Sequence, residues 1–144
     1  MDRTKAGFKA LRERVGMSQQ DVADALGVNV KTVKRWEQPQ FPYGAPDDAW
    51  ELLEGLLRTQ REAVEACYEQ AAQAVERQGR MPGMVVMTYF RDQDMYDEFG
   101  RDEGPYGVAN ANARAAAAEL ERLGLEVEFR YPTEGAMRTP GSRY

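Results

Sequence analysis

The chain has 144 residues, of which 42% are apolar and 30% charged, so it can bury a hydrophobic core and form one or two small domains. It contains no histidine and one cysteine, Cys67, which excludes the common zinc sites, histidine-based catalytic triads and an internal disulfide. The net charge is −5, no apolar run approaches the roughly 20 residues of a membrane span, and the charged N-terminus does not resemble a signal peptide, so we expect a cytoplasmic protein without a membrane partner.

Three short helices are predicted at the N-terminal end. Apolar side chains recur at helical spacing between Lys5 and Gly16, and glycine is a typical residue to end a helix. Ser18 then provides a capping hydroxyl for a second helix, which ends at Gly27. Asn29 is the cap of a third helix.

The third helix, residues 30–37, has two distinct faces. Val33 and Trp36 lie three positions apart on its inner face, where they can pack against the other two helices. The outer face carries the charged residues Lys31, Lys34 and Arg35. The pattern therefore predicts a helix that is anchored on one side and presents positive charge on the other.

A proline-rich loop and a long helix follow. Residues 38–46 contain three prolines and a glycine, and we expect Phe41 and Tyr43 in this loop to pack back on the three helices. Asp47 and its acidic neighbour suit the positive end of a helix, which reaches nearly to Gly79. An apolar stripe runs along this helix: Trp50, Leu53, Leu57, Val64, Cys67 or Tyr68, Ala71 and Val75. Because three short helices cannot cover a stripe of this length, the long helix needs a further partner.

The remaining sequence predicts a small α/β unit. Residues 84–90 form a continuous apolar run, which is typical of a strand buried on both faces. Residues 106–123 form an alanine-rich helix that ends at Gly124, and residues 125–131 alternate strictly, as in a strand with one face in water. Between these segments we expect a short helix or turn over residues 92–99, followed by a loop.

These elements predict a mainly α-helical fold with a small β unit. We expect an N-terminal domain over residues 1–45, a C-terminal α/β part over residues 46–132 and a loose tail over residues 133–144. Residues 1–38 carry eight Lys and Arg against five Asp and Glu, whereas residues 39–144 carry eleven against nineteen. The basic N-terminal region favours contact with a polyanion, although a chance fluctuation of charge gives the same counts.

The stretch from Met17 to Glu37 carries the clearest functional signal. Ala23 lets the second helix cross closely over the third, and Gly27 permits the sharp turn between them. One rigid helix surface is then left facing outward, and it fits the major groove of B-DNA, which is about 12 Å wide. With its S-Q-x-x-V-A start and its W-E pair, the stretch resembles the helix-turn-helix of the phage-repressor family (Cro/CI-like, XRE). The resemblance implies a lambda-repressor-like fold and sequence-specific DNA binding.

The same resemblance implies which residues contact DNA. The base-reading positions correspond to Val30, Lys31, Thr32, Lys34 and Arg35. Gln19 corresponds to a residue that holds a backbone phosphate, Gln38 corresponds to a phosphate-contacting loop position, and the cap Asn29 completes the candidate DNA-binding set.

The chemistry of these side chains leaves several assignments open. Arg35 or Lys31 can donate to O6 and N7 of a guanine, and Val30 or the methyl group of Thr32 can contact a thymine methyl. Lys34 is equally well explained as a solvated or phosphate-contacting side chain. We expect Trp36 and Glu37 to be structural, because the indole packs inward and the acid repels phosphate.

The order of elements along the whole chain resembles that of the YdiL-like regulators and the anti-CRISPR-associated autorepressors of phages. The shared features are the W-E pair, a loop, Pro46-Asp47-Asp48, a long helix, a strand ending in Tyr89-Phe90 and a helix rich in small residues. The resemblance implies that the C-terminal α/β part forms a homodimer and that the protein represses its own operon through an inverted repeat. The chain differs from that group in its longer tail from Pro132 and its more acidic C-terminal part.

Dimerisation also has an independent argument, since two domains about 34 Å apart can read both half-sites of a palindromic operator. Alternatively, helix 47–78 packs on residues 84–131 within one chain.

A second function that fits is an antitoxin whose acidic C-terminal part binds a protein partner. The acid-rich segment 92–103 could hold a divalent cation, but a solvated loop explains it better. We expect no cofactor and no catalysis, and a cytoplasmic protein that joins the nucleoid when bound to DNA.

Overall fold

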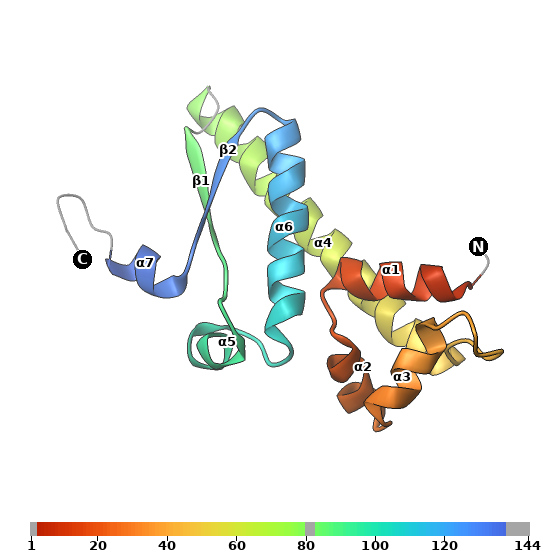
Figure 1. The fold of residues 1–144 in the computed structure, drawn as a ribbon. Helices are drawn as coiled ribbons and strands as arrows, with labels where there is room; N and C mark the ends of the chain where they lie inside the picture. The colour runs from red at the N-terminus through yellow and green to blue at the C-terminus, as the bar shows by residue number, and fades with distance from the viewer. Residues whose placement is uncertain (1–2, 80–82, 138–144) are drawn as a thin grey trace. The chain divides into compact units, whose positions relative to one another are not determined.

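The computed structural model describes residues 3–79 and 83–137, and its fold is mainly helical with one small sheet (Figure 1). In chain order the elements are α1 (Lys5–Val15), α2 (Gln19–Leu26), α3 (Val30–Glu37), α4 (Asp47–Gln78), β1 (Met84–Thr88), α5 (Gln93–Phe99), α6 (Tyr106–Arg122), β2 (Glu126–Arg130) and α7 (Pro132–Met137). The predicted fold class and the order of its elements are confirmed.

The chain divides into two compact units, which we call the N-terminal unit (residues 1–60) and the C-terminal unit (residues 61–144). The division falls inside α4, so the first half of the long helix belongs with the three short helices. None of the helices among residues 3–79 and 83–137 is long and apolar enough to cross a membrane.

The predicted caps Gly16, Ser18, Gly27 and Asn29 lie at ends of the three N-terminal helices. The Ser18 hydroxyl accepts the backbone N–H of Asp21 while the Asp21 carboxylate accepts that of Ser18, each at 2.9 Å, which makes a capping box at α2. The Asn29 side chain accepts the backbone N–H of Lys31 at 2.8 Å and caps α3. Gly27 has a φ of 66°, the left-handed conformation that permits the short turn between α2 and α3.

Aromatic rings form the core of the N-terminal unit. Phe8 on α1 meets Trp36 on α3 and Trp50 on α4 edge to face, with ring centroids 6.0 and 5.3 Å apart. Val33 and Leu53, on the same helices as the two tryptophans, are also fully buried. The inner face of α3 is therefore fixed by packing, and its opposite face is left on the surface.

The C-terminal unit is built around a two-stranded parallel sheet. Met84 pairs with Glu126 at one end of the sheet and Thr88 pairs with Arg130 at the other, and α5 and α6 connect the two strands. Helix α6 packs on both strands through a side rich in small residues. Its buried residues are Asn110, Ala111, Ala116, Ala117 and Leu120.

The strand over residues 84–90 is confirmed as β1, but the expectation that it is buried on both faces is wrong. Met84 and Val86 are 47% and 46% exposed. Paired residues of parallel strands share a face, so these two side chains lie with Glu126 and Glu128 on one side, which we call the open sheet face. A two-stranded sheet that is covered by one layer of helix leaves such a face uncovered. A continuous apolar run in the sequence does not indicate whether one or both faces of its strand are covered.

The tail is also partly different from the expectation. We expected a loose tail from Thr133, but its first residues are helical and belong to α7. This helix starts at Pro132, and proline suits the first turn of a helix. The last residues of that segment, 138–144, lie outside the described residues.

Polar side chains hold the loops of the C-terminal unit. The Asn110 amide accepts the backbone N–H of Phe90 at 2.9 Å and donates to its carbonyl at 2.7 Å. Gln93 donates to the Gly104 carbonyl at 2.9 Å and accepts the N–H of Tyr106 at 3.0 Å, which fixes the loop before α6. Within the described residues, no group of three or more acidic or cysteine side chains is arranged to hold a metal ion.

Candidate nucleic-acid interface

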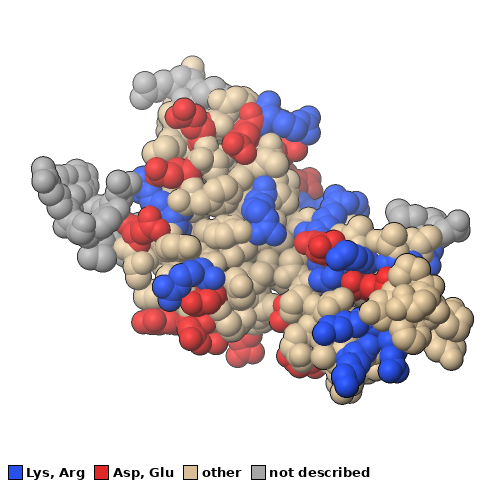
Figure 2. Space-filling model, viewed as in Figure 1, with Lys and Arg blue, Asp and Glu red and all other residues tan. Residues whose placement is uncertain are grey.

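The outer face of α3 is the most basic exposed helix surface of the N-terminal unit. Lys31, Lys34 and Arg35 are exposed, while Val33 and Trp36 are buried on the opposite side. Figure 2 shows Lys and Arg side chains gathered over the part of the surface where α3 lies. Within residues 3–79 and 83–137, none of these three cations forms an ion pair. Their charge is therefore available to a ligand.

The structure places most of the candidate DNA-binding residues together on α3. Asn29 at its N-cap is exposed, and Val30 and Thr32 are half-buried in its first turns. Gln38 is exposed at the C-cap, where its backbone N–H donates to the Arg35 carbonyl at 3.2 Å. Among the candidate residues on α3, Lys31, Lys34 and Arg35 are the fully exposed ones within the helix.

Gln19 comes from a different helix and reaches the far end of α3. It is the first residue of α2, and its side-chain amide donates to a carboxylate oxygen of Glu37 at 3.2 Å. The Gln19 side chain is therefore held in place next to the last turn of α3, and it is half-buried.

A buried ion pair explains the W-E pair that ends the motif. The guanidinium of Arg12 donates to both carboxylate oxygens of Glu37, from Nε at 2.7 Å and from Nη2 at 3.0 Å, and its Nη1 donates to the Met17 carbonyl at 2.9 Å. The side chains of Arg12 and Glu37 are only 9% and 4% exposed. This bidentate pair ties α1 to the end of α3, in addition to the apolar packing of Trp36.

Sequence reasoning missed Arg12, although a signal for it exists. Arg12 lies four positions after Phe8 and three before Val15, so it occupies the buried face of α1 rather than its charged face. A buried arginine requires an acidic partner, and Glu37 was the acid already expected to be structural.

Lys5 fixes the other side of the C-terminal end of α3. Its Nζ donates to the carbonyls of Arg35 at 3.0 Å and Trp36 at 3.2 Å, and also to the carbonyl of Tyr43 in the following loop. A lysine at this position satisfies the last carbonyls of the helix and complements the negative end of its dipole. Lys5 thereby joins α1, α3 and the loop after α3.

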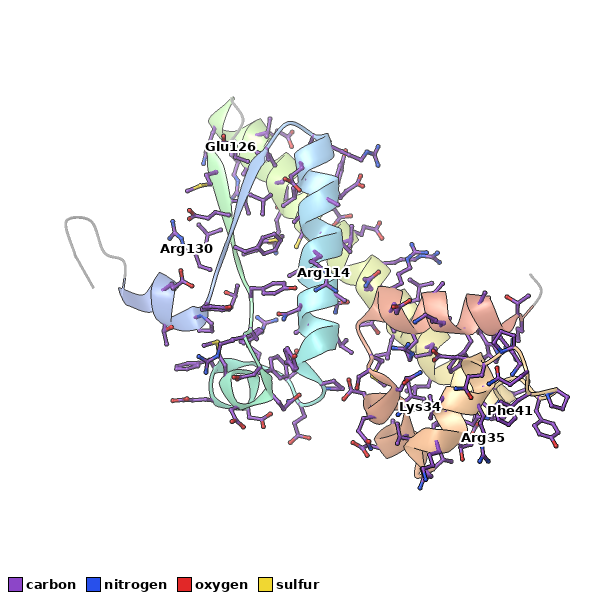
Figure 3. The ribbon with its side chains drawn as sticks, viewed as in Figure 1. Lys34, Arg35, Phe41, Arg114, Glu126 and Arg130 are labelled. Atoms are coloured by element: carbon purple, nitrogen blue, oxygen red, sulfur yellow. The ribbon has the colours of Figure 1, made fainter. Side chains whose placement is uncertain are left out.

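The loop after α3 contacts the basic face itself. The guanidinium carbon of Arg35 lies 5.4 Å from the centroid of the Phe41 ring, in a cation–π contact. Figure 3 shows Lys34 and Arg35 on α3, with Phe41 close to Arg35. The loop packs back as predicted through Phe41, which is half-buried, whereas the Tyr43 side chain is 74% exposed and the expectation that it packs back is wrong.

The arrangement can bind a nucleic acid by shape and charge. An α-helix held on one side by a core and exposed on the other can enter the major groove, and unpaired cations on its outer face can contact phosphates or base edges.

Residues 8–38 match the family model HTH_3, a helix-turn-helix. No curated protein matches the chain significantly. The matched segment starts inside α1 and ends at the C-cap of α3, so residues 8–38 are similar to a helix-turn-helix domain of the Cro/CI type (XRE family).

Proposed function

We propose that this protein is a dimeric transcriptional repressor that reads an inverted repeat through α3 and represses its own operon, without catalysis or a cofactor. The observation that carries the proposal is the unpaired basic face of α3, because it lies on a helix-turn-helix domain that is otherwise closed by its own core. The α3 helix of each copy enters the major groove of one half-site.

We further propose roles for the individual side chains. Arg35 or Lys31 donates to O6 and N7 of a guanine, because neither positive charge has an ion-pair partner in the described part of the chain. Val30 and Thr32 provide methyl groups for thymine. Phosphates are contacted by the polar residues around the helix, Gln19, Asn29, Lys34 and Gln38.

The open sheet face supports the dimer. Met84 and Val86 expose apolar side chains there, and the strand that carries them belongs to a sheet of only two strands. Small isolated sheets are weakly stable until their apolar face is covered. A second copy of the C-terminal unit covers this face, and two DNA-binding domains then share one palindrome.

DNA recognition is tested with duplexes selected from a random-sequence library by the full chain. We expect a preferred sequence with a twofold repeat, for which Arg35→Ala loses about 1–3 kcal/mol of binding free energy and relaxes the preference at one position per half-site. Gln19→Ala weakens all duplexes more evenly. Arg101→Ala is the matched control, because Arg101 is an exposed arginine of the C-terminal unit. Equal binding of selected and random duplexes at moderate salt contradicts the proposal.

The dimer is tested with Val86→Asp in the full chain. Replacing this apolar side chain by a third acid beside Glu126 and Glu128 should convert the dimer to a monomer in sedimentation analysis and weaken operator binding, while the tryptophan fluorescence of the N-terminal unit is unchanged. Leu123→Asp is the control, because Leu123 is 38% exposed at the end of α6 and lies outside this face. A wild-type chain that sediments as a monomer at micromolar concentration contradicts this part of the proposal.

A second candidate function is an antitoxin, favoured by the acidic composition of residues 39–144, which carry nineteen Asp and Glu against eleven Lys and Arg. In that case the C-terminal unit binds a basic protein partner and the helix-turn-helix regulates the shared operon. An adjacent reading frame for a small toxic protein that forms a stable complex with the chain would favour this function over simple repression.

A further inference from the structure

We propose that Phe41 is a positioning residue for DNA recognition: its ring holds the Arg35 guanidinium ready to read one base pair. The inference rests on the proposed function, since it assigns Arg35 to a base. It adds that sequence preference is set partly by the loop after α3.

The contact between the two side chains is specific. The Arg35 guanidinium carbon lies 5.4 Å from the Phe41 ring centroid, and Arg35 is exposed whereas Phe41 is half-buried (Figure 3). Across residues 3–79 and 83–137, Arg35 forms no ion pair that would compete with the ring. The ring is therefore the one charge-stabilising neighbour that the described residues provide for this guanidinium.

The position of Phe41 is fixed by groups other than its own side chain. Its backbone N–H donates to the Gln38 carbonyl at 3.2 Å, which makes a turn directly after α3. Beyond it, the carbonyl of Tyr43 accepts from Lys5 Nζ, which also binds the carbonyls of Arg35 and Trp36. The loop is thus anchored on both sides of Phe41, and a change of the Phe41 side chain leaves these anchors in place.

The physical consequence concerns orientation rather than charge. A phenyl ring has no hydrogen-bond acceptor, so the five N–H donors of the guanidinium remain available to the O6 and N7 atoms of a guanine. A long arginine side chain that is already restricted before binding loses less rotamer entropy when it forms a bidentate contact. A phosphate contact gains little from such orientation, because phosphates accept from many directions. Removing the ring should therefore reduce discrimination more than overall affinity.

The test uses Phe41→Leu, which keeps an apolar side chain without a ring, Phe41→Tyr, which keeps the ring, and Arg35→Ala. The full chain is titrated with the duplex selected by the wild type, with its single base-pair variants and with a random duplex of the same length. Phe41→Leu should reduce discrimination about two- to five-fold at the base pair that Arg35→Ala affects and leave the other positions unchanged. Phe41→Tyr should retain wild-type discrimination. In the Arg35→Ala background, Phe41→Leu should have no further effect.

Two results overturn the inference while leaving the proposed function intact. One is a loss with Phe41→Leu that is equal on all duplexes or persists in the Arg35→Ala background, which shows that Phe41 only supports the loop. The other is an Arg35→Ala variant that discriminates as well as the wild type. A wild-type chain that prefers no sequence overturns the inference and the proposed function together. Tryptophan fluorescence during urea unfolding checks that each variant keeps the wild-type stability.

Discussion

The N-terminal and C-terminal units bury different kinds of side chains. Among the described residues, the five largest fully buried side chains all lie in the N-terminal unit: Phe8, Val15, Val22, Val33 and Leu53. The C-terminal unit buries mainly alanines of α6 with Tyr96, Leu120 and Leu125, and it exposes Met84, Val86 and Phe129 on its strands. The first unit is therefore closed by its own core, whereas the second leaves apolar strand surface in contact with solvent.

This difference agrees with the roles that we propose for the two units. A helix proposed to read DNA must keep its position, and α3 is held by Trp36, by the Arg12–Glu37 pair and by Lys5. A surface proposed to bind a second copy must instead be open in the single chain. The C-terminal unit keeps its shape through polar clamps, such as Asn110 on Phe90, rather than through a large apolar interior.

The largest expected effect comes from breaking the buried ion pair of the N-terminal unit. Arg12→Ala leaves the Glu37 carboxylate buried without its main partner, so we expect the free energy of unfolding of this unit to fall by about 3–5 kcal/mol. Both tryptophans of the chain, Trp36 and Trp50, lie in this unit. Their fluorescence during urea denaturation therefore measures the change without interference from the C-terminal unit.

The exposed pair of Lys9 and Glu13 on the same helix provides the control. Both side chains are more than half exposed, and Lys9 Nζ lies 3.6 Å from a carboxylate oxygen of Glu13. Lys9→Ala should therefore change the free energy of unfolding of this unit by less than about 1 kcal/mol. Replacing both Arg12 and Glu37 by methionine should recover much of the loss, because no buried charge is then left unpaired. If Arg12→Ala is no more harmful than Lys9→Ala, the ion pair is not what closes this unit.

An intermediate effect is expected in the C-terminal unit. Asn110→Ala removes both hydrogen bonds to the backbone of Phe90 and leaves its N–H and carbonyl without partners, at a cost of about 2–3 kcal/mol in the stability of this unit. Hydrogen exchange of the amides in β1, β2 and α6 should become faster, while the tryptophan transition is unchanged.

Asn112 is a matched control two residues away on the same helix. Its side-chain oxygen is buried and accepts no hydrogen bond from the described residues. Asn112→Ala therefore removes a buried polar atom without breaking a hydrogen bond to that atom. We expect Asn112→Ala to be neutral or stabilising. If the amides of β1, β2 and α6 exchange as fast in Asn112→Ala as in Asn110→Ala, the two hydrogen bonds between Asn110 and Phe90 do not stabilise this unit specifically.

Local signals in the sequence were enough to predict the helices that carry the site. Ser18, Gly27 and Asn29 mark helix ends through contacts within a few residues, and the alternation of buried and charged positions orients α3. Contacts between distant residues could not be predicted in this way. The Arg12–Glu37 pair spans 25 positions and Lys5 reaches 30 or more, so no periodicity connects these residues. The exposure of Val86 was missed because it depends on how many layers cover the sheet.

The smallest expected effect concerns the pH dependence of the C-terminal unit. Asp92 caps α5, and the hydrogen bond that its carboxylate accepts from the backbone N–H of Met95 at 2.9 Å, assisted by Arg91, holds the pKa of Asp92 below its ordinary value. A lowered pKa in the folded state means that the contribution of Asp92 to stability is complete above the unfolded pKa of about 3.9 and is lost as the pH falls through the folded value.

Asp92→Asn separates this effect from the titration of the other carboxylates, because asparagine is also a good cap and does not titrate. Between pH 5 and pH 2.5, the amides of α5 should lose more protection from hydrogen exchange in the wild type than in Asp92→Asn. The tryptophan transition of the N-terminal unit should have the same pH dependence in both proteins, because Asp92 belongs to the other unit. An equal loss of α5 protection in both proteins would show that the cap acts independently of its charge.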